Sequence, residues 1–374
     1  MKQTSLSNLS PDGSSRFYVM TFLLKILYKN VPKDRIKVLD VGGASPYMEE
    51  AFNKLGFDGE LSIIDKLPPP KGVKSSSYTQ SDANNMPFSD KSFDVVISTD
   101  VLEHIETGSK LKFIEECLRV AKSYVIIAAP FETAGVDQSE HSVNRLNQNL
   151  FGHGQEWLEE HFLYKKPKIN EIEDYLIKEG FKWDILGAGN LYLWLVSACA
   201  NLMEAKLGID REKHEELNKI FGHEILLSGE MNPPYYRHFL VVYKNIPNAF
   251  LREEIQINDS KDLNHRAGLN YVSGLMALLS EHMQNQNNEI KELTLKVSKL
   301  NTSSLKEQNR MLVEELRNCQ VKLDEQGKII KQCSPYIHFL ETAQMKVIQK
   351  GLRMLTSRRS AAQKSINTNE EKNK

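Results

Sequence analysis

The sequence of 374 residues predicts an α/β fold: a doubly wound, seven-stranded sheet followed by a long C-terminal α-helical coiled coil. Two observations support this. Between about Arg16 and Lys244, short β-branched runs alternate with stretches of helical period, which is typical of a parallel sheet covered by helices. From Val272 to Pro335 there is no aromatic residue, and apolar residues recur with heptad spacing.

The expected sheet domain spans residues 16–247. Its strands are expected at residues 36–41, 60–65, 77–81, 93–98, 124–128, 183–186 and 238–243. Helices are expected near residues 17–29, 47–55, 111–121 and 169–179, with one or two more across 191–221. Because helical stretches separate most of these short runs, one doubly wound domain accounts for the whole pattern.

A linker is expected at residues 248–271 and a coiled coil at 272–334. Apolar residues with 4-3 spacing occur at Leu279, Met283, Ile290, Leu293, Val297 and Leu300, and then at Leu305, Leu312, Leu316, Cys319, Leu323 and Ile330. Asn309 and Gln326 fall at seam positions, where buried amides fix register and strand number. The pattern predicts a homo-oligomer held through residues 279–330. The alternative, a solvated single helix, would leave the apolar stripe uncovered.

Residues 335–374 are expected to form a basic amphipathic helix and a disordered tail. From Tyr336 to Lys374 the formal charge is +5, so the overall charge of −1 conceals an acidic remainder of −6. A helix with one apolar and one basic face suits the surface of an anionic membrane, and we expect peripheral contact through residues 336–359. Packing of this helix on the coiled coil is the alternative.

Several classes of protein are not favoured. The near-neutral charge argues against a nucleic-acid partner. The four cysteines are widely spaced, which fits a reducing, cytoplasmic compartment. Residues 1–15 lack the apolar run of a signal peptide and are expected to be a flexible leader. The longest apolar run, residues 191–203, is shorter than the roughly 20 residues of a membrane span.

The segment that points to chemistry is Val38–Ser45, a strand that ends in Asp40-Val41-Gly42-Gly43. Glycine has no Cβ, so the chain at this first strand-to-helix turn can approach a ligand closely. The spacing is not the G-x-G-x-x-G fingerprint of dinucleotide-binding proteins, because Ala44, Ser45 and Pro46 follow Gly43.

In this segment and those after it, the sequence resembles the class I S-adenosylmethionine-dependent methyltransferases, which have a Rossmann-like fold. Asp65 ends the second expected strand, Ser81-Asp82-Ala83 follows the third, and residues 93–104 resemble the F-D-V-V and V-L-E-H runs of the type 11 branch. The resemblance implies S-adenosyl-L-methionine as cofactor. It also implies a set of cofactor-binding residues: Asp40, Gly42, Gly43, Asp65, Asp82, Ala83, Thr99 and Asp100.

An acceptor hydroxyl would benefit from a general base, and histidines are the first candidates. We expect His104, His141 and His153 to be catalytic, with His161 a further candidate in the histidine-rich connection after the fifth strand. Asp100, Glu103 and His104 have i, i+3, i+4 spacing, so a helix that begins there would present them together. The run resembles the acidic-x-x-Glu-His group of ubiquinone-pathway O-methyltransferases, and this resemblance permits a divalent cation. We expect no metal, with Asp100 capping the helix and lining the cofactor pocket.

The expected coiled coil and basic tail help to indicate which molecule accepts the methyl group. A coiled coil and a basic tail resemble the arrangement in methyltransferases of cell-surface polysaccharide biosynthesis, including chain terminators. The resemblance implies O-methylation of a glycan or lipid-linked acceptor at the inner face of the cytoplasmic membrane. Two alternatives remain open: a methyltransferase for a quinone or another small molecule, and a non-catalytic coiled-coil scaffold with a vestigial methyltransferase fold.

Overall fold

The computed structural model describes residues 6, 9, 11–29, 35–43, 46–69, 77–207, 233–244 and 284–296, and part of the stretch 314–328. The chain divides into two compact units, residues 1–285 and 286–374. The first unit contains the sheet domain and is described by itself below.

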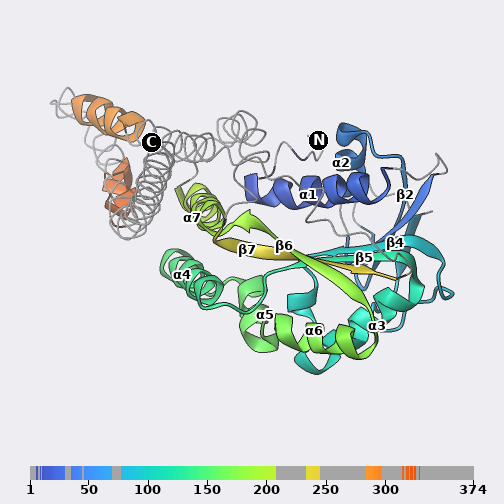
Figure 1. Ribbon diagram of the computed structural model, residues 1–374. Helices are drawn as coiled ribbons and strands as arrows, with labels where there is room; N and C mark the ends of the chain where they lie inside the picture. The colour runs from blue at the N-terminus through green and yellow to red at the C-terminus, as the bar shows by residue number, and fades with distance from the viewer. Residues whose placement is uncertain are drawn as a thin grey trace, which may run out of the picture. The chain divides into compact units, whose positions relative to one another are not determined.

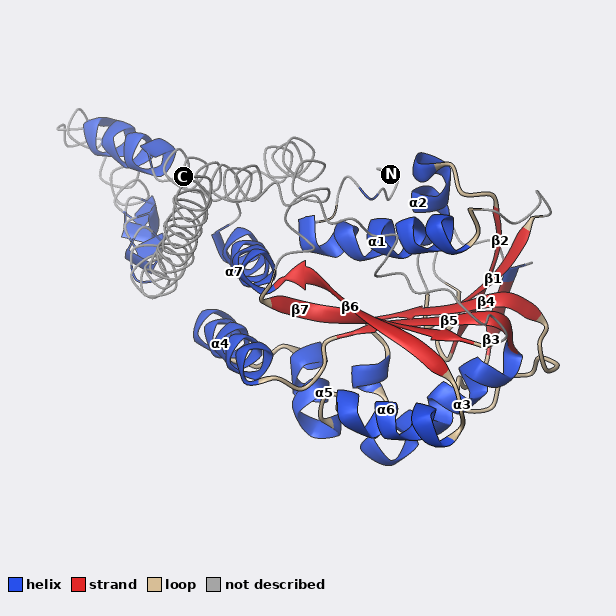
Figure 2. Ribbon diagram, viewed as in Figure 1, coloured by secondary structure: helices blue, strands red, loops and turns tan. Residues whose placement is uncertain are grey.

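The described residues of this unit form one seven-stranded sheet (Figures 1 and 2). Its strands, in the spatial order β3-β2-β1-β4-β5-β7-β6, are β3 (Tyr78–Gln80), β2 (Gly59–Asp65), β1 (Ile36–Val41), β4 (Phe93–Thr99), β5 (Ala121–Ala129), β7 (Tyr235–Tyr243) and β6 (Lys182–Asn190). Strands β1 to β5 are parallel to one another, whereas β7 is antiparallel to both β5 and β6.

Helices cover both faces of the sheet (Figure 2). On one face lie α1 (Pro11–Leu27), α2 (Tyr47–Leu55) and α7 (Leu191–Leu207), and on the other lie α3 (Lys110–Val120), α5 (Glu156–Tyr164) and α6 (Ile169–Lys178). Helix α4 (Ala134–Phe151) contacts α7. Two short 3₁₀ turns, η3 (Leu102–His104) and η4 (Thr107–Ser109), connect β4 to α3.

Each face of the sheet has its own core. Val38 and Ile97 belong to the cluster that includes α1 and α2, whereas Leu39 and Val96 belong to the cluster that includes α3 and α6. Adjacent residues of the central strands therefore bury their side chains on opposite faces. This explains why these strands are continuous apolar runs rather than alternating ones.

The predicted strands all occur, but one direction and two helices differ from expectation. The sequence favoured a parallel sheet, whereas β7 runs antiparallel. A strand buried on both faces has the same apolar pattern in either direction, so periodicity carries no information on this point. The connection after β5 was expected to be a loop, yet it contains α4 and α5.

The chain before the sheet is also more ordered than expected. Helix α1 begins at Pro11, within the expected flexible leader, and Ser14 and Ser15 are buried. No helix among the described residues is both long enough and apolar enough to cross a membrane.

In the second unit, residues 286–296 are helical, as are the described positions between 314 and 328. This agrees with the helical character predicted for the segment. The remainder of the predicted coiled coil, the linker at 248–271 and the basic helix and tail at 335–374 lie outside the described residues.

Candidate active site

The site lies where the parallel strands end. Strand β1 pairs with β2 on one side and β4 on the other, so the strand order reverses direction between β1 and β4. Asp40 is the next-to-last residue of β1, Asp65 is the last residue of β2, and Asp100 directly follows β4. Open α/β sheets bind ligands at the carboxyl ends of strands beside such a switch point.

The turn after β1 is tightly packed at two glycines. Gly42 has a φ of +78°, and a Cβ built on it would lie 2.3 Å from Val101 Cγ2. A Cβ on Gly43 would lie 2.0 Å from Asp40 Oδ2. A larger residue at either position would force the turn after β1 to move, which is the physical reason for glycine at both positions.

Asp40 is 2% exposed, and its Oδ1 has no hydrogen-bond partner among the described residues. Burial raises the pKa of this carboxyl group to about 7, and the charge of Asp65 adds to the effect, while Arg16 opposes it. A buried acceptor of this kind is costly unless a donor or a positive charge reaches it.

The other predicted cofactor residues also lie at the ends of strands. Asp65 Oδ1 accepts from the Leu67 amide at 2.8 Å. Asp82 is exposed after β3, and its Oδ1 accepts from the Asn84 amide at 2.8 Å. Ala83 is half-buried, as is Thr99, whose buried Oγ1 is without a hydrogen-bond partner in the described part of the chain.

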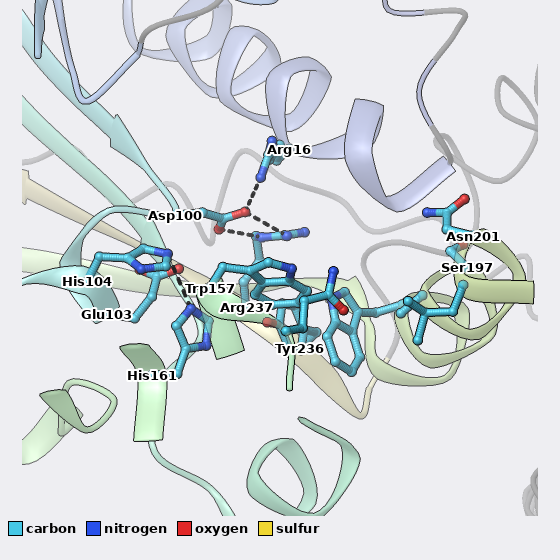
Figure 3. A pocket seen from close by; sticks show the side chains of 14 residues that line it. Arg16, Asp100, Glu103, His104, Trp157, His161, Ser197, Asn201, Tyr236 and Arg237 are labelled. Atoms are coloured by element: carbon cyan, nitrogen blue, oxygen red, sulfur yellow. Dashed lines mark hydrogen bonds and ion pairs between the residues drawn. The ribbon is translucent and has the colours of Figure 1, made fainter. Parts of the chain in front are cut away.

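A pocket of about 300 Å³ opens beside Asp100 (Figure 3). Elements far apart in the sequence enclose it, namely α1, η3, α5, α7 and β7. Its lining residues are Arg16, Asp100, Glu103, His104, Gln155, Trp157, His161, Trp194, Ser197, Ala198, Asn201, Leu202, Tyr236 and Arg237.

Two arginines hold the Asp100 carboxylate. Arg237, 2% exposed, donates from Nε to Oδ1 and from Nη2 to Oδ2, both at 2.9 Å, and Arg16 Nη1 also contacts Oδ2. Although burial opposes ionisation, the two guanidinium groups keep the pKa of Asp100 well below its usual range. Asp100 therefore does not cap a helix as expected; its φ of +54° directs the carboxylate toward the arginines.

A chain of hydrogen bonds joins the two histidines of the pocket to two acidic groups, the buried Glu140 and the half-exposed Glu160. His104 Nδ1 lies 2.7 Å from Glu160 Oε2, and His104 Nε2 lies 3.3 Å from His161 Nε2. His161 Nδ1 lies 3.0 Å from Glu140 Oε1. Burial and the neighbouring His161 lower the pKa of His104, against the opposing effect of Glu160.

Glu140 is itself fixed from two further directions. Its Oε2 accepts from Lys166 Nζ at 2.7 Å, and its Oε1 accepts from the Tyr236 hydroxyl at 2.9 Å. Despite burial, His161 and Lys166 lower the pKa of Glu140. Glu140 is thus ionised, and its contact with Nδ1 holds the His161 ring in one orientation.

Glu103 lies beside the two imidazoles. It is 1% exposed, and its Oε2 has no hydrogen-bond partner within the described ranges. Burial and the nearby Asp100 raise its pKa well above the usual value. Lys110 donates to the carbonyls of Leu102 at 2.7 Å and Ile105 at 2.5 Å, which fixes the η3 turn that carries Glu103 and His104.

The structure separates the histidines that the sequence grouped together. His104 and His161 line the pocket. His141 and His153 are exposed and are not among its lining residues: His141 stacks on Phe162 at 4.2 Å, and His153 Nδ1 contacts the Gly154 carbonyl. For His141 the helix explains this, because α4 presents Glu140 inward and its neighbour His141 outward. His153 lies after the end of α4.

Sequence reasoning missed the two arginines and the buried Glu140. Arg237 lies one residue before the predicted start of the last strand, in a Tyr-Tyr-Arg run that reads as a loop. Arg16 marks the start of the predicted domain, but no motif links it to Asp100. For Glu140, the available signal is the density of acidic and histidine residues after β5.

Comparisons with known proteins agree with this geometry. Residues 42–129 match the family model described as "Methyltransferase domain". An uncharacterized methyltransferase of Mycolicibacterium gilvum (strain PYR-GCK) is 29% identical over 108 residues, which are 26% of this chain and 42% of the relative. The match thus spans less than half of that relative's length.

The solved structures that match have low sequence identity. A putative sarcosine dimethylglycine methyltransferase from Galdieria sulphuraria is 16% identical, with 62% of this chain and 86% of the other covered and a TM-score of 0.40. The magnesium protoporphyrin IX methyltransferase of Synechocystis PCC 6803, solved with bound SAH, is 12% identical, with 62% and 84% covered and a TM-score of 0.38.

The matched segment runs from the glycine turn to the end of β5 and thus includes the strand ends that carry Gly42, Asp65 and Asp100. The sheet order and the tight turn after β1 fit that assignment. Residues 42–129 therefore match a methyltransferase domain, and this match supports an S-adenosylmethionine-dependent methyltransferase.

Proposed function

We propose that the protein transfers the methyl group of S-adenosyl-L-methionine to a hydroxyl oxygen of a glycan or lipid-linked glycan. The observation that supports this most is the pocket beside Asp100. It begins at the carboxyl end of β4, next to the glycine turn, and it contains buried imidazoles together with aromatic and amide side chains. A donor at the strand ends and an acceptor in the pocket would be neighbours.

The residues at the strand ends fit this cofactor. The buried Asp40 Oδ1, without a partner among the residues described, suits the positively charged methionine part. Gly42 and Gly43 leave room for it, and Asp65 at the end of β2 can accept from ribose hydroxyls. When bound, the cofactor supplies a sulfonium methyl group that is already electrophilic.

The protein's task is then mainly to place the acceptor and exclude water. The oxygen–hydrogen bond of the acceptor breaks, a carbon–oxygen bond forms and the carbon–sulfur bond breaks, leaving S-adenosylhomocysteine. In the protein without a bound cation, the His104–His161 pair is the pocket group that suits the released proton. Arg16 and Arg237 hold Asp100, which keeps the pocket wall in place between donor and acceptor.

The glycan proposal draws on the chemistry of the pocket lining. Trp194 and Tyr236 stack with ring centres 4.0 Å apart, and Trp157 lies edge-on to Trp194. Asn201 and Ser197 lie among the same lining residues. Trp194 and Tyr236 are buried against each other, so the half-buried Trp157 is the aromatic residue more accessible to a sugar ring, beside these amide and hydroxyl groups.

A methyl-transfer assay on the full-length protein tests this function. Labelled S-adenosylmethionine is offered with oligosaccharides, lipid-linked glycans and quinols. We expect label in the glycan fraction. Label only in quinols would favour the small-molecule alternative, and failure to bind cofactor in calorimetry would favour the scaffold.

Asp65→Ala is the matched variant for the cofactor. Loss of a charged acceptor typically costs about 1–3 kcal/mol, so we expect cofactor affinity to fall about 5- to 150-fold. The control is Glu60→Ala, which alters an exposed acidic residue at the opposite end of the same strand and should leave the affinity unchanged. Equal effects of the two variants would contradict the assigned position of the ribose.

The C-terminal part is proposed to oligomerise the enzyme through residues 279–330. The heptad pattern and the helix at residues 284–296 support this. A protein that ends at Asn285, the boundary of the first compact unit, is expected to be a monomer that still binds cofactor. Light scattering checks this, and a truncated protein that remains oligomeric would place the contact in the sheet domain.

Peripheral attachment to the inner face of the cytoplasmic membrane is proposed for residues 336–359. The support is the basic and apolar composition of this segment. Removal of residues 336–374 should abolish co-sedimentation with vesicles that contain anionic lipid, whereas unchanged sedimentation would favour packing on the coiled coil.

A further inference from the structure

The geometry points to a divalent transition-metal site formed by Glu103, His104 and His161, with zinc as the ion that fits the distances best. One potential ligand atom from each of the three residues lies within 4.8 Å of the others. They come from η3 and α5, two elements that contact each other although more than 50 residues separate them in the sequence (Figure 3).

The orientation of the two imidazoles is the first argument. A carboxylate faces Nδ1 of each ring: Glu160 at 2.7 Å for His104 and Glu140 at 3.0 Å for His161. Because a carboxylate accepts hydrogen bonds, Nδ1 carries the proton in both neutral rings, and both Nε2 atoms present lone pairs. These two lone pairs face each other across 3.3 Å, an arrangement that a metal ion between them would stabilise.

The separation of the two nitrogens is the second argument. Two nitrogens that bind one zinc ion at about 2.0–2.1 Å with a tetrahedral angle are about 3.3–3.4 Å apart. The observed Nε2–Nε2 distance is 3.3 Å. The two rings are therefore already spaced as zinc ligands, and no backbone movement is needed to bring them together.

Glu103 supplies the third ligand. Its side chain is 1% exposed, and its Oε2 has no partner among the described residues. A buried carboxylate oxygen without a partner is unfavourable unless a cation reaches it. A side-chain adjustment of about 1–1.5 Å brings it to a ligand's distance from an ion held by the two imidazoles.

The surroundings of the three ligands resemble the outer shell of a metal site. Ligating histidines usually donate their second nitrogen to a carboxylate, which fixes the ring and raises its basicity. Glu160 and Glu140 have this position here, and Lys166 and Tyr236 hold Glu140 in turn. Asp100 is not a ligand, because Arg237 and Arg16 occupy its carboxylate.

Two imidazoles and one carboxylate favour zinc or iron over magnesium or calcium, which prefer oxygen ligands. Three protein ligands leave coordination positions open, and the ligands line the pocket. Such an ion would bind the acceptor oxygen directly. This role, unlike the site itself, rests on the proposed methyl transfer.

The test is a calorimetric titration of the full-length protein with Zn²⁺ after removal of metal with a chelator. We expect one tight site per chain. Glu103→Gln and His104→Gln should each weaken zinc binding by at least tenfold, since loss of an outer-shell partner alone costs about 10–100-fold. Glu160→Gln, which changes a half-exposed outer-shell residue, should weaken it about tenfold.

The matched control replaces His141 and His153 by glutamine, because both are exposed histidines of the same region outside the cluster. This variant should bind zinc as the parent does. Cofactor affinity and thermal unfolding show whether each variant is folded. If folded Glu103→Gln and His104→Gln proteins bind zinc like the control, the inference is overturned and the imidazoles share a proton instead.

The two hypotheses can fail separately. A protein that binds zinc at this site but no S-adenosylmethionine would overturn the proposed function and support the metal site. A protein that binds S-adenosylmethionine but no zinc would overturn the metal site and leave the proposed function standing.

Discussion

Replacing Arg237 by alanine is expected to destabilise the protein by about 3 kcal/mol or more at neutral pH, because removing one partner of a buried ion pair leaves the other charge uncompensated. Arg237 is 2% exposed and donates two hydrogen bonds to Asp100. Without it, Arg16 alone would face the carboxylate, and Arg16 is more exposed. Chemical denaturation at pH 7.5 measures the loss.

The loss of stability caused by Arg237→Ala should depend on pH. In the folded protein the pKa of Asp100 lies below its usual value, so the ion pair contributes stability above the pKa of an unfolded aspartate, about 3.9. This contribution disappears as the pH falls through the folded pKa. The difference between Arg237→Ala and the parent should therefore shrink as the pH falls below 4.

Arg16→Ala is the matched control for this prediction. It removes the more exposed arginine and leaves both Arg237–Asp100 hydrogen bonds in place. We expect a smaller loss, about 1–2 kcal/mol, as for a single charge-assisted hydrogen bond. Equal losses in the two variants would show that the buried, two-bonded contact is not the dominant one.

Gly42→Ala is expected to abolish measurable cofactor binding, with a loss in stability of several kcal/mol. The left-handed conformation costs an alanine about 1–2 kcal/mol, and its Cβ would lie 2.3 Å from Val101 Cγ2. Val101 has little freedom to rotate away, because it is β-branched. The turn after β1 must therefore move, and the residues beside it move with it. Calorimetry with S-adenosylmethionine measures the effect.

Gly180→Ala is the control that separates the cost of the left-handed backbone from the steric overlap with Val101. Gly180 has a φ of +73°, close to that of Gly42, but a Cβ at this position would meet no described atom within 4 Å. We expect a loss of about 1–2 kcal/mol in stability and unchanged cofactor affinity. Adding Val101→Ala to Gly42→Ala should restore part of the stability. If Gly180→Ala and Gly42→Ala behaved alike, the close approach to Val101 would be unimportant.

The strand ends at which we propose that the cofactor binds could be predicted largely from the sequence. The central parallel strands are short β-branched runs; Gly42 follows β1, Asp65 ends β2 and Thr99 ends β4, so position along the chain also gives position at the sheet edge. Asp40, Asp65 and Asp100 were placed in this way. The environment of each carboxylate could not be predicted, because Arg16 and Arg237 reach Asp100 from opposite ends of the domain.

The acceptor side was less predictable. Helices α4 and α5 carry many histidine, glutamate and asparagine residues, which suggested a loop. Their apolar residues, including Val136, Val143 and Leu150, are spaced by sevens and are buried. The choice of His161 over His141 depends on which face of each helix packs inward, and a local sequence pattern does not record the position of the partner element. His153 lies in the connection between α4 and α5.

The antiparallel direction of β7 also determines when the site can form. β7 lies between β5 and β6, so β6 has no neighbour in the sheet until residues 235–243 are in place. The same strand brings Arg237 to Asp100 and Tyr236 to Glu140. During synthesis on the ribosome, a chain that ends before β7 can contain all the parallel strands β1 to β5. Such a chain still has an open sheet edge at β5 and lacks the residues of β7 that complete the pocket.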